Sequence, residues 1–177
     1  MPVPTPRRMR HGVAFAGFEF DERVRSALHR GKYGGNRRAL EALGALTATR
    51  LEAEGARSRL SVPGAVVAVP LGPRRRRQRG YNQSDLIARV LADARRVPLV
   101  GGLHRVRDTA PQSARAVEER RTNVAGAFTW KGMPLEGARL WLVDDVLTTG
   151  ATVEAAASAL ALERTSRIDV VVVAVVP

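Results

Sequence analysis

Apolar residues cluster in short runs along this chain, and the runs are separated by stretches in which Leu and Ala recur at helical spacing. Three runs lack the polar–apolar alternation of a half-exposed strand, so each predicts a buried strand: AVVAVP (65–70), RLWLVD (139–144) and IDVVVVAVV (168–176). Shorter extended pieces are expected at 97–107 and 126–130. Helical periodicity predicts helices over 21–30, 36–54, 83–96 and 152–163, with Asn82 or Ser84 as the cap of the third.

Buried strands separated by helices predict an α/β fold, in which a central, mostly parallel sheet is flanked by helices on both faces. With 177 residues, the chain is expected to form one domain over 1–177. Residues 1–11 are rich in Pro and Arg and are expected to be frayed. Turns or loops are expected at GKYGG (31–35), at LGPRRRRQRGYN (71–82) and at 108–112, and a helix is expected to begin at Ser113.

The composition argues against several kinds of site and against a membrane-spanning segment. The chain contains no cysteine, which excludes disulfides, thiolate zinc sites and a cysteine nucleophile, and its three histidines are not spaced to share a metal. The apolar run VVVVAVV (170–176) is far shorter than the roughly 20 residues of a membrane-spanning helix. Acidic residues follow GVAFAGF (12–18) at once, so no signal peptide is expected, and the sequence predicts a cytoplasmic protein without membrane insertion.

The net charge of +12 is unevenly distributed. Residues 1–107 contain 22 Lys or Arg and 8 Asp or Glu, a balance of +14, whereas residues 108–177 contain 7 and 9, a balance of −2. A basic half favours polyanionic partners, either nucleic acid or a small phosphorylated ligand. A GC-rich coding bias towards Arg is the alternative explanation of the total charge, and it explains the clustering less well.

The segment 140–160 holds the most informative chemistry. Asp144 and Asp145 end a hydrophobic run, and Thr148, Thr149, Gly150, Ala151 and Thr152 form a turn into the next helix. Ligands of such sheets bind beyond the carboxyl ends of the strands. A helix start with a glycine suits a phosphate group, while carboxylates accept hydrogen bonds from vicinal hydroxyls. The pattern therefore predicts a ribose 5-phosphate ligand.

The same segment invites two other interpretations. A Walker B strand holding Mg²⁺ needs a phosphate loop of the form G-x-x-x-x-G-K-[ST], but the Gly31-Lys32 pair precedes Tyr33 and lacks the earlier glycine. An ordinary strand-to-helix turn with capping acids is the second alternative, although one acid would suffice for a cap.

The stretch LWLVDDVLTTGAT (140–152) resembles, at all thirteen positions, the phosphoribosyl pyrophosphate (PRPP) motif of type I phosphoribosyltransferases. The resemblance implies that Asp144 and Asp145 bind the ribose hydroxyls and that Thr148 to Thr152 bind the 5-phosphate. It also implies Mg²⁺ as a cofactor, held by pyrophosphate and ribose oxygens and by no protein ligand directly.

Other segments are similar to the ComF/GntX family, which is linked to DNA uptake in natural competence. They are AVPLGPRRRRQRGYNQSDLIARVLA (68–92), DTAPQSARAVEERRTNVAGAF (108–128) and LHRGKYGGNRRALEALGALTA (28–48). Many members begin with a four-cysteine zinc ribbon; this chain has no cysteine, so no zinc role carries over. The family implies other competence proteins as partners, whereas the acceptor and the oligomeric state are not specified.

The arginine-rich segment 70–79 falls where this resemblance implies the pyrophosphate loop, formed by Pro70, Leu71, Gly72, Pro73 and Arg74. Five arginines in six residues exceed the need of one pyrophosphate. The surplus Arg75, Arg76, Arg77 and Arg79 fit either a solvated loop or a nucleic-acid contact, with Tyr81 as a base-stacking candidate. Residues 105–122 would form the mobile hood, where Arg105, Arg107, Arg120 and Arg121 either close over pyrophosphate or lie on a plain surface helix.

Two classes of function follow from these residues. The first is a PRPP-dependent transferase that relies on leaving-group neutralisation and positioning, with no catalytic base assigned. The second is a non-catalytic module on the same scaffold that binds single-stranded DNA through its basic half.

Overall fold

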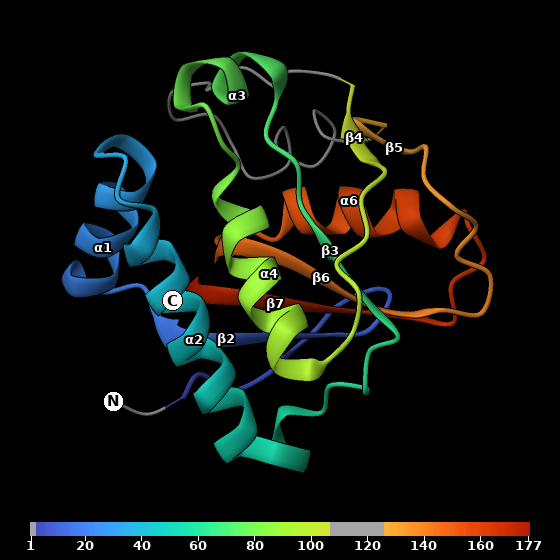
Figure 1. Ribbon diagram of the computed structural model, residues 1–177. Coiled ribbons are helices and arrows are strands. Elements are labelled where there is room, and N and C mark those ends of the chain that lie inside the picture. Colours follow the sequence, from blue (N-terminus) through green and yellow to red (C-terminus); the bar gives the residue numbers. More distant parts are fainter. Residues whose placement is uncertain (1–2, 107–125) are drawn as a thin grey trace.

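The computed structural model describes residues 3–106 and 126–177, and these form the predicted α/β fold. A five-stranded sheet has the order β1-β2-β7-β6-β3 (Figure 1). Its strands are β1 (Arg7–Arg8), β2 (Val13–Glu19), β3 (Ala65–Ala68), β6 (Arg139–Leu147) and β7 (Arg167–Val175). Neighbouring strands are parallel except β1, which is antiparallel to β2. The three strands predicted from apolar runs are confirmed.

Helices cover both faces of this sheet, as its non-alternating strands predict. Side chains of α1, α2 and α4 share one buried cluster with Phe15 and Val171 of the sheet, and α6 shares another with Leu142 and Val170. The described helices are α1 (Glu22–Tyr33), α2 (Arg37–Glu54), the 3₁₀ helix η1 (Gly55–Ser58), α3 (Pro73–Arg79), α4 (Gln83–Arg95) and α6 (Ala151–Ala161). Asn82 caps α4, one of the two caps predicted.

Two predicted loops prove to be helical. The segment Gly31-Lys32-Tyr33 continues α1, and only Gly34 ends that helix, so the predicted GKYGG turn is too long. The arginine-rich loop contains α3, which has Pro73 in its first turn and is terminated by Gly80 at φ 74°. Proline at a helix start and a left-handed glycine after the end are ordinary helix signals, and arginine is a good helix former. The arginines therefore project from a short helix.

The N-terminal segment is more ordered than predicted. Arg7 and Arg8 pair with β2 as strand β1, so the expectation that residues 1–11 are frayed is wrong at these positions. Strand β2 was not predicted; its central residues are buried, and it lies beside β7 inside the sheet. The extended pieces expected at 97–107 and 126–130 contain β4 (Leu103–Arg105) and β5 (Phe128–Trp130), an antiparallel pair. The predicted turn at 108–112 and the helix from Ser113 lie outside the described residues.

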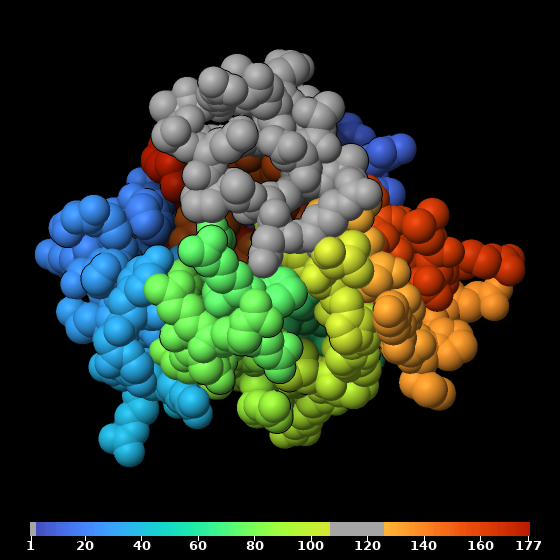
Figure 2. All heavy atoms as spheres, turned by 90° about the horizontal axis from the view of Figure 1, so that it is seen from above, coloured from blue at the N-terminus to red at the C-terminus, as the bar shows by residue number. Residues whose placement is uncertain are grey.

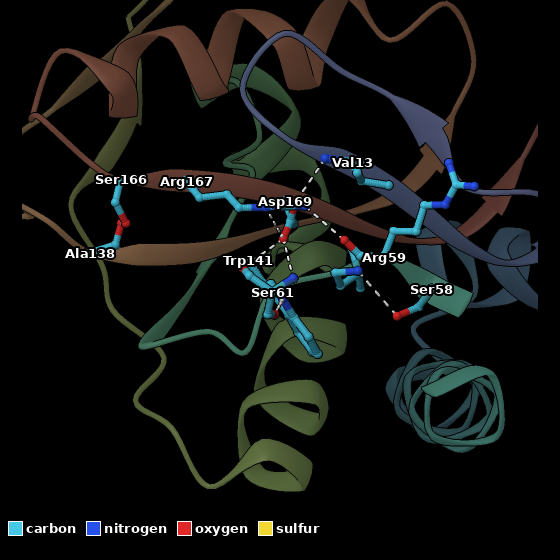
Figure 3. Close-up of polar contacts among 10 residues, drawn as sticks. Val13, Ser58, Arg59, Ser61, Ala138, Trp141, Ser166, Arg167 and Asp169 are labelled. Carbon is cyan, nitrogen blue, oxygen red and sulfur yellow. Dashed lines mark hydrogen bonds and ion pairs between the residues drawn. The ribbon is translucent and has the colours of Figure 1, made fainter. Parts of the chain in front are cut away.

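A buried carboxylate joins several segments near the starts of β6 and β7 (Figure 3). Asp169 is fully buried, and it accepts hydrogen bonds from the backbone N–H of Val13 (2.9 Å), from both the N–H and the hydroxyl of Ser61 (2.7 and 2.8 Å) and from Nε of Arg167 (3.0 Å). Trp141 donates its indole N–H to the Ser61 carbonyl at 2.9 Å. We call this set the Asp169 clamp. The clamp holds together the amino ends of β6 and β7, at the end of these strands opposite to the acid pair.

Candidate functional site

The two acids lie close to the carboxyl end of β6. The strand continues through them to Leu147, so the predicted end of the strand at Asp144 is three residues too early. Asp145 is 6% exposed and Asp144 is half-buried. Each carboxylate accepts the backbone N–H of the following residue, at 2.9 Å for Asp144 and 2.8 Å for Asp145. These bonds orient both carboxylates along the strand.

Each acid has a different partner from a helix that packs on the sheet. Ser84, in the first turn of α4, donates its hydroxyl to Asp144 at 2.9 Å. Lys32, in the last turn of α1, forms an ion pair with Asp145. Sequence reasoning treated Ser84 only as a helix cap and gave Lys32 no role. A contact between residues this far apart in the chain leaves no local signal, although the family-like segment 28–48 contains Lys32.

The acid pair holds a proton more firmly than free carboxylates do. Burial, and after it the negative charge of Asp145, raise the pKa of Asp144 from its usual 3.8 to about 7. The bonds from Asp145 N–H and Ser84 and the charge of Lys32 act in the opposite direction. Asp144 therefore keeps its proton through the mildly acidic range and loses it only near pH 7.

The turn after β6 lies next to Asp144. Gly150 has φ 83° and is the N-cap of α6, and as a glycine it makes no side-chain cap bond. The N–H of Ala151 donates to the Thr149 hydroxyl at 3.4 Å, which leaves the N–H groups after Ala151 in the first turn without a side-chain cap. A small cleft of about 20 Å³ is lined by Asp144, Thr148, Gly150 and Thr152, together with apolar side chains of β6 and α6. Four of the predicted ribose-phosphate residues thus meet around one cleft, next to a helix N-terminus that favours anions.

The remaining two residues of the predicted turn, Thr149 and Ala151, line a different cavity. This cavity has a volume of about 470 Å³ and lies between the N-terminal segment and the outer side of α6, with Arg7, Arg8 and Arg10 in its wall. Gly150 lines both spaces. The glycine therefore separates the small cleft from a cavity within the usual size range of small-molecule sites.

The predicted pyrophosphate loop leaves β3 beside the acids. The N–H of Val69 donates to the carbonyl of Val143 at 2.8 Å, one residue before Asp144. Asn82 donates its side-chain amide to the Val69 carbonyl at 3.0 Å and thereby ties the start of the loop to the start of α4. Pro70, Leu71 and Gly72 form the loop itself, whereas Pro73 and Arg74 begin α3. The loop and the acid pair are consequently neighbours at one edge of the sheet.

Helix α3 lies next to the segment that ends α1 (Figure 2). Arg79 donates to the hydroxyl of Tyr33 at 3.1 Å, and its guanidinium lies 4.9 Å from the centre of that ring. Tyr33 is 62% exposed, and α3 buries none of its residues. Tyr81 is half-buried instead, with its hydroxyl bonded to the Gly31 carbonyl and Arg37 over its ring. The exposed aromatic ring of this surface is therefore Tyr33, which sequence reasoning did not single out.

Of the predicted hood residues, only Arg105 belongs to the described part. It lies in β4, with its guanidinium 5.5 Å from the ring centre of Phe128. Arg107, Arg120 and Arg121 lie outside the described residues. Over residues 3–106 and 126–177, no group of three or more His, Cys, Asp or Glu is arranged to hold a metal ion. In the same ranges, no helix combines the length and the apolar character that a membrane crossing requires.

The chain is similar to curated proteins named as competence proteins and DNA utilization proteins, whereas no family model matches the chain. Competence protein F of Haemophilus influenzae is 38% identical over 96 residues, which cover 52% of this chain and 42% of that protein. DNA utilization protein YhgH of Escherichia coli K12 is 38% identical over 103 residues (53% and 41%), and competence protein ComFC of Bacillus subtilis is 34% identical over 95 residues (54% and 37%). The match thus spans about two fifths of each relative's length.

Solved structures resemble the chain more distantly. Hypoxanthine-guanine phosphoribosyl transferase of L. donovani is 17% identical and has a TM-score of 0.43, with 77% of this chain and 71% of that chain covered. A hypothetical protein from Neisseria gonorrhoeae with bound ppGpp is 15% identical at the same TM-score, with 76% and 65% covered. Likenesses this distant bear on neither the substrate nor the partners of this chain.

Proposed function

Because the chain is a homologue of competence protein F, of ComFC and of YhgH, we propose that it is a phosphoribosyltransferase-like protein that binds PRPP with Mg²⁺ and serves DNA uptake. The observation that carries this proposal is the cleft in which Asp144 meets Thr148, Gly150 and Thr152. The Asp144 carboxylate can accept hydrogen bonds from the ribose hydroxyls. The start of α6 can donate backbone N–H groups to the 5-phosphate at the other end of the same ligand.

Each part of the site has a role in this proposal. Asp144 and Asp145 accept the ribose hydroxyls, and the turn from Thr148 to Thr152 donates N–H and hydroxyl groups to the 5-phosphate. The loop from Pro70 to Arg74 receives the pyrophosphate. Mg²⁺ arrives with PRPP, because pyrophosphate and ribose oxygens are the hard ligands that this ion prefers, and the protein holds it through them.

Transfer of the phosphoribosyl group would break the bond between C1 of the ribose and pyrophosphate. Positive charge develops on the ribose as the pyrophosphate leaves, and a nitrogen nucleophile of the acceptor then forms the new bond to C1. The chain contributes positioning of the ribose through the acids and neutralisation of the leaving group through arginine. The acceptor would deliver the nucleophile without a protein base.

Calorimetric titration of the purified protein with PRPP and Mg²⁺ tests this function. We expect micromolar affinity for the wild type and at least a 100-fold loss in Asp144→Asn/Asp145→Asn, because two charge-assisted hydrogen bonds of about 1.5–3 kcal/mol each would be weakened. The control is Glu41→Gln/Glu136→Gln, which removes two exposed carboxylates elsewhere. A folded wild type that does not bind PRPP would refute the proposal, as would equal binding by the double variant.

A second candidate function, binding of single-stranded nucleic acid, is favoured by the surface of α1 and α3. We define the α3 surface as His29, Tyr33, Arg74, Arg75, Arg76, Arg77 and Arg79. It combines an exposed aromatic ring with a row of cations, and His29 lies 4.9 Å from Tyr33 between ring centres. Single-stranded nucleic acids bind to such surfaces through base stacking and phosphate neutralisation.

Fluorescence anisotropy with a labelled oligo-dT tests this surface. We expect binding that weakens steeply with salt, and Arg75→Gln/Arg77→Gln should reduce the slope of log K against log salt by about 1.4, or about 0.7 for each lost phosphate contact. Tyr33→Ala should weaken binding by roughly tenfold with the slope unchanged, because stacking contributes about 1–3 kcal/mol per base. Arg57→Gln/Arg139→Gln, two exposed arginines away from the α3 surface, is the matched control. Salt-insensitive binding, or equal effects of both arginine pairs, would contradict this role.

A further inference from the structure

Lys32 is the cation that faces the acid pair. It lies in the last turn of α1, and its ammonium forms an ion pair with Asp145. The Lys32 side chain is 22% exposed and that of Asp145 is 8% exposed, so the carboxylate is buried while the ammonium side of the pair is partly accessible to solvent. A ligand could therefore reach this charge pair from the side of Lys32.

The neighbouring residues hold this turn of α1 in place. Gly31 is buried against α2, where a Cβ atom would lie only 2.5 Å from Cγ of Leu40. Its carbonyl accepts the hydroxyl of Tyr81, the residue before the cap of α4. The turn is therefore fixed between α2 and the start of α4. This packing of Gly31 holds the next residue, Lys32, in position to pair with Asp145.

Lys32 has donors left for a ligand. An ammonium group has three N–H donors, and in the described part of the chain Asp145 is the partner recorded for Lys32. The next residue, Tyr33, contacts Arg79 of α3. The end of α1 thus contacts the acid pair through Lys32 and contacts α3, the helix that follows the proposed pyrophosphate loop, through Tyr33.

We propose that Lys32 is a further ligand-binding residue of this site and that it contacts the diphosphate group of PRPP. This inference rests on the proposed function, since it assigns a residue to the same ligand. In the empty site the ammonium offsets the charge of Asp145. With the ligand bound, the same ammonium donates to a diphosphate oxygen as well, which reduces the repulsion between the acids and the leaving group.

The first test compares ligands that do and do not carry the diphosphate. We expect Lys32→Met to weaken Mg²⁺-pyrophosphate and PRPP at least tenfold in calorimetry, and to weaken ribose 5-phosphate less than threefold. Lys32→Arg should restore most of the affinity because it keeps a cation. Lys131→Met, at the other lysine of the chain, is the control and should change nothing. Equal losses for all three ligands would mean that Lys32 only supports Asp145, and would overturn the proposal.

The second test needs no variant of the site. Because the chain has only two lysines, acetylation followed by mass spectrometry reports on each separately. We expect saturating Mg²⁺-pyrophosphate to slow the acetylation of Lys32 at least fivefold and to leave Lys131 unaffected. If the wild type binds PRPP but Lys32 is not protected, the inference fails while the proposed function stands. If the wild type binds neither PRPP nor pyrophosphate, both fail.

Discussion

Asp144→Asn is expected to stabilise the protein at pH 8 and to change its stability little at pH 4. The pKa of Asp144 is raised to about 7 by burial and by the charge of Asp145. Between its usual pKa of 3.8 and about 7, the folded state keeps a proton that the unfolded chain releases. The free energy of unfolding therefore falls as the pH rises through this window, and the full cost is present above pH 7.

The size of this effect is bounded by the shift itself. At about 1.4 kcal/mol per pKa unit, the charged Asp144 costs at most about 4 kcal/mol at pH 8. An asparagine carries no charge, and its side-chain oxygen still accepts the bonds from Asp145 N–H and Ser84. Urea unfolding of the wild type and the variant at pH 4, 6 and 8 measures the difference, with Asp93→Asn on the exposed side of α4 as the control. Parallel pH profiles of the wild type and Asp144→Asn would contradict the expectation.

This cost also distinguishes the two interpretations of the acid pair. A pair that merely capped a helix would stabilise the folded state, whereas the raised pKa of Asp144 predicts that its charged form destabilises the fold. Neither carboxylate caps α6, which has no side-chain cap. Residues that destabilise a fold are typically retained for binding or catalysis. If Asp144→Asn is both more stable and unable to bind PRPP, the site exchanges stability for function.

Asp169→Ala is expected to lower the free energy of unfolding by about 4 kcal/mol, the largest loss for any single substitution proposed here. The change leaves the N–H groups of Val13 and Ser61 and the guanidinium of Arg167 without their buried acceptor. Asp169→Asn should lower the free energy of unfolding by less than this but still by more than about 1 kcal/mol. The NH₂ of the asparagine would face N–H donors that bond to a carboxylate oxygen in the wild type.

Urea unfolding at pH 7 measures these losses. The control is Glu136→Gln, which breaks the exposed ion pair with Arg164 and should cost less than about 1 kcal/mol. A loss below 1 kcal/mol for Asp169→Ala would mean that the Asp169 clamp contributes little to the fold. PRPP binding of the folded fraction should be unchanged, since the clamp and the acids lie at different ends of β6.

The sequence predicted the parts of the fold that depend on local pattern. Non-alternating apolar runs gave β3, β6 and β7, and helical spacing gave α1, α2, α4 and α6. The helix α3 was missed because a row of arginines looks like a solvated loop, although Pro73 and Gly80 carried the relevant signals. Strand β2 was missed because the residues that it buries on the α6 face, Ala14 and Ala16, are small and weaken the apolar pattern, while Phe15 is buried on the opposite face.

The candidate site was predictable in its acids and its turn, since these are contiguous in sequence. Lys32 and Ser84 were not predictable as partners of the acids, because each contact depends on how a helix packs against the sheet. Tyr33 was passed over for the same reason: its exposure depends on where α1 ends, and the predicted end was too early. Contacts between distant segments require the assembled fold.

The placement of the Asp169 clamp has a consequence for how this protein can change over evolution. In the register of β6 and β7, Asp169 is opposite Trp141 and Val172 is opposite Asp144. Two sites on different ends of the same strands, with no shared partner, should respond to substitutions almost independently. A library varied around 148–152 would therefore yield folded proteins with new ligand preferences, whereas one varied around the clamp would mostly yield unfolded chains.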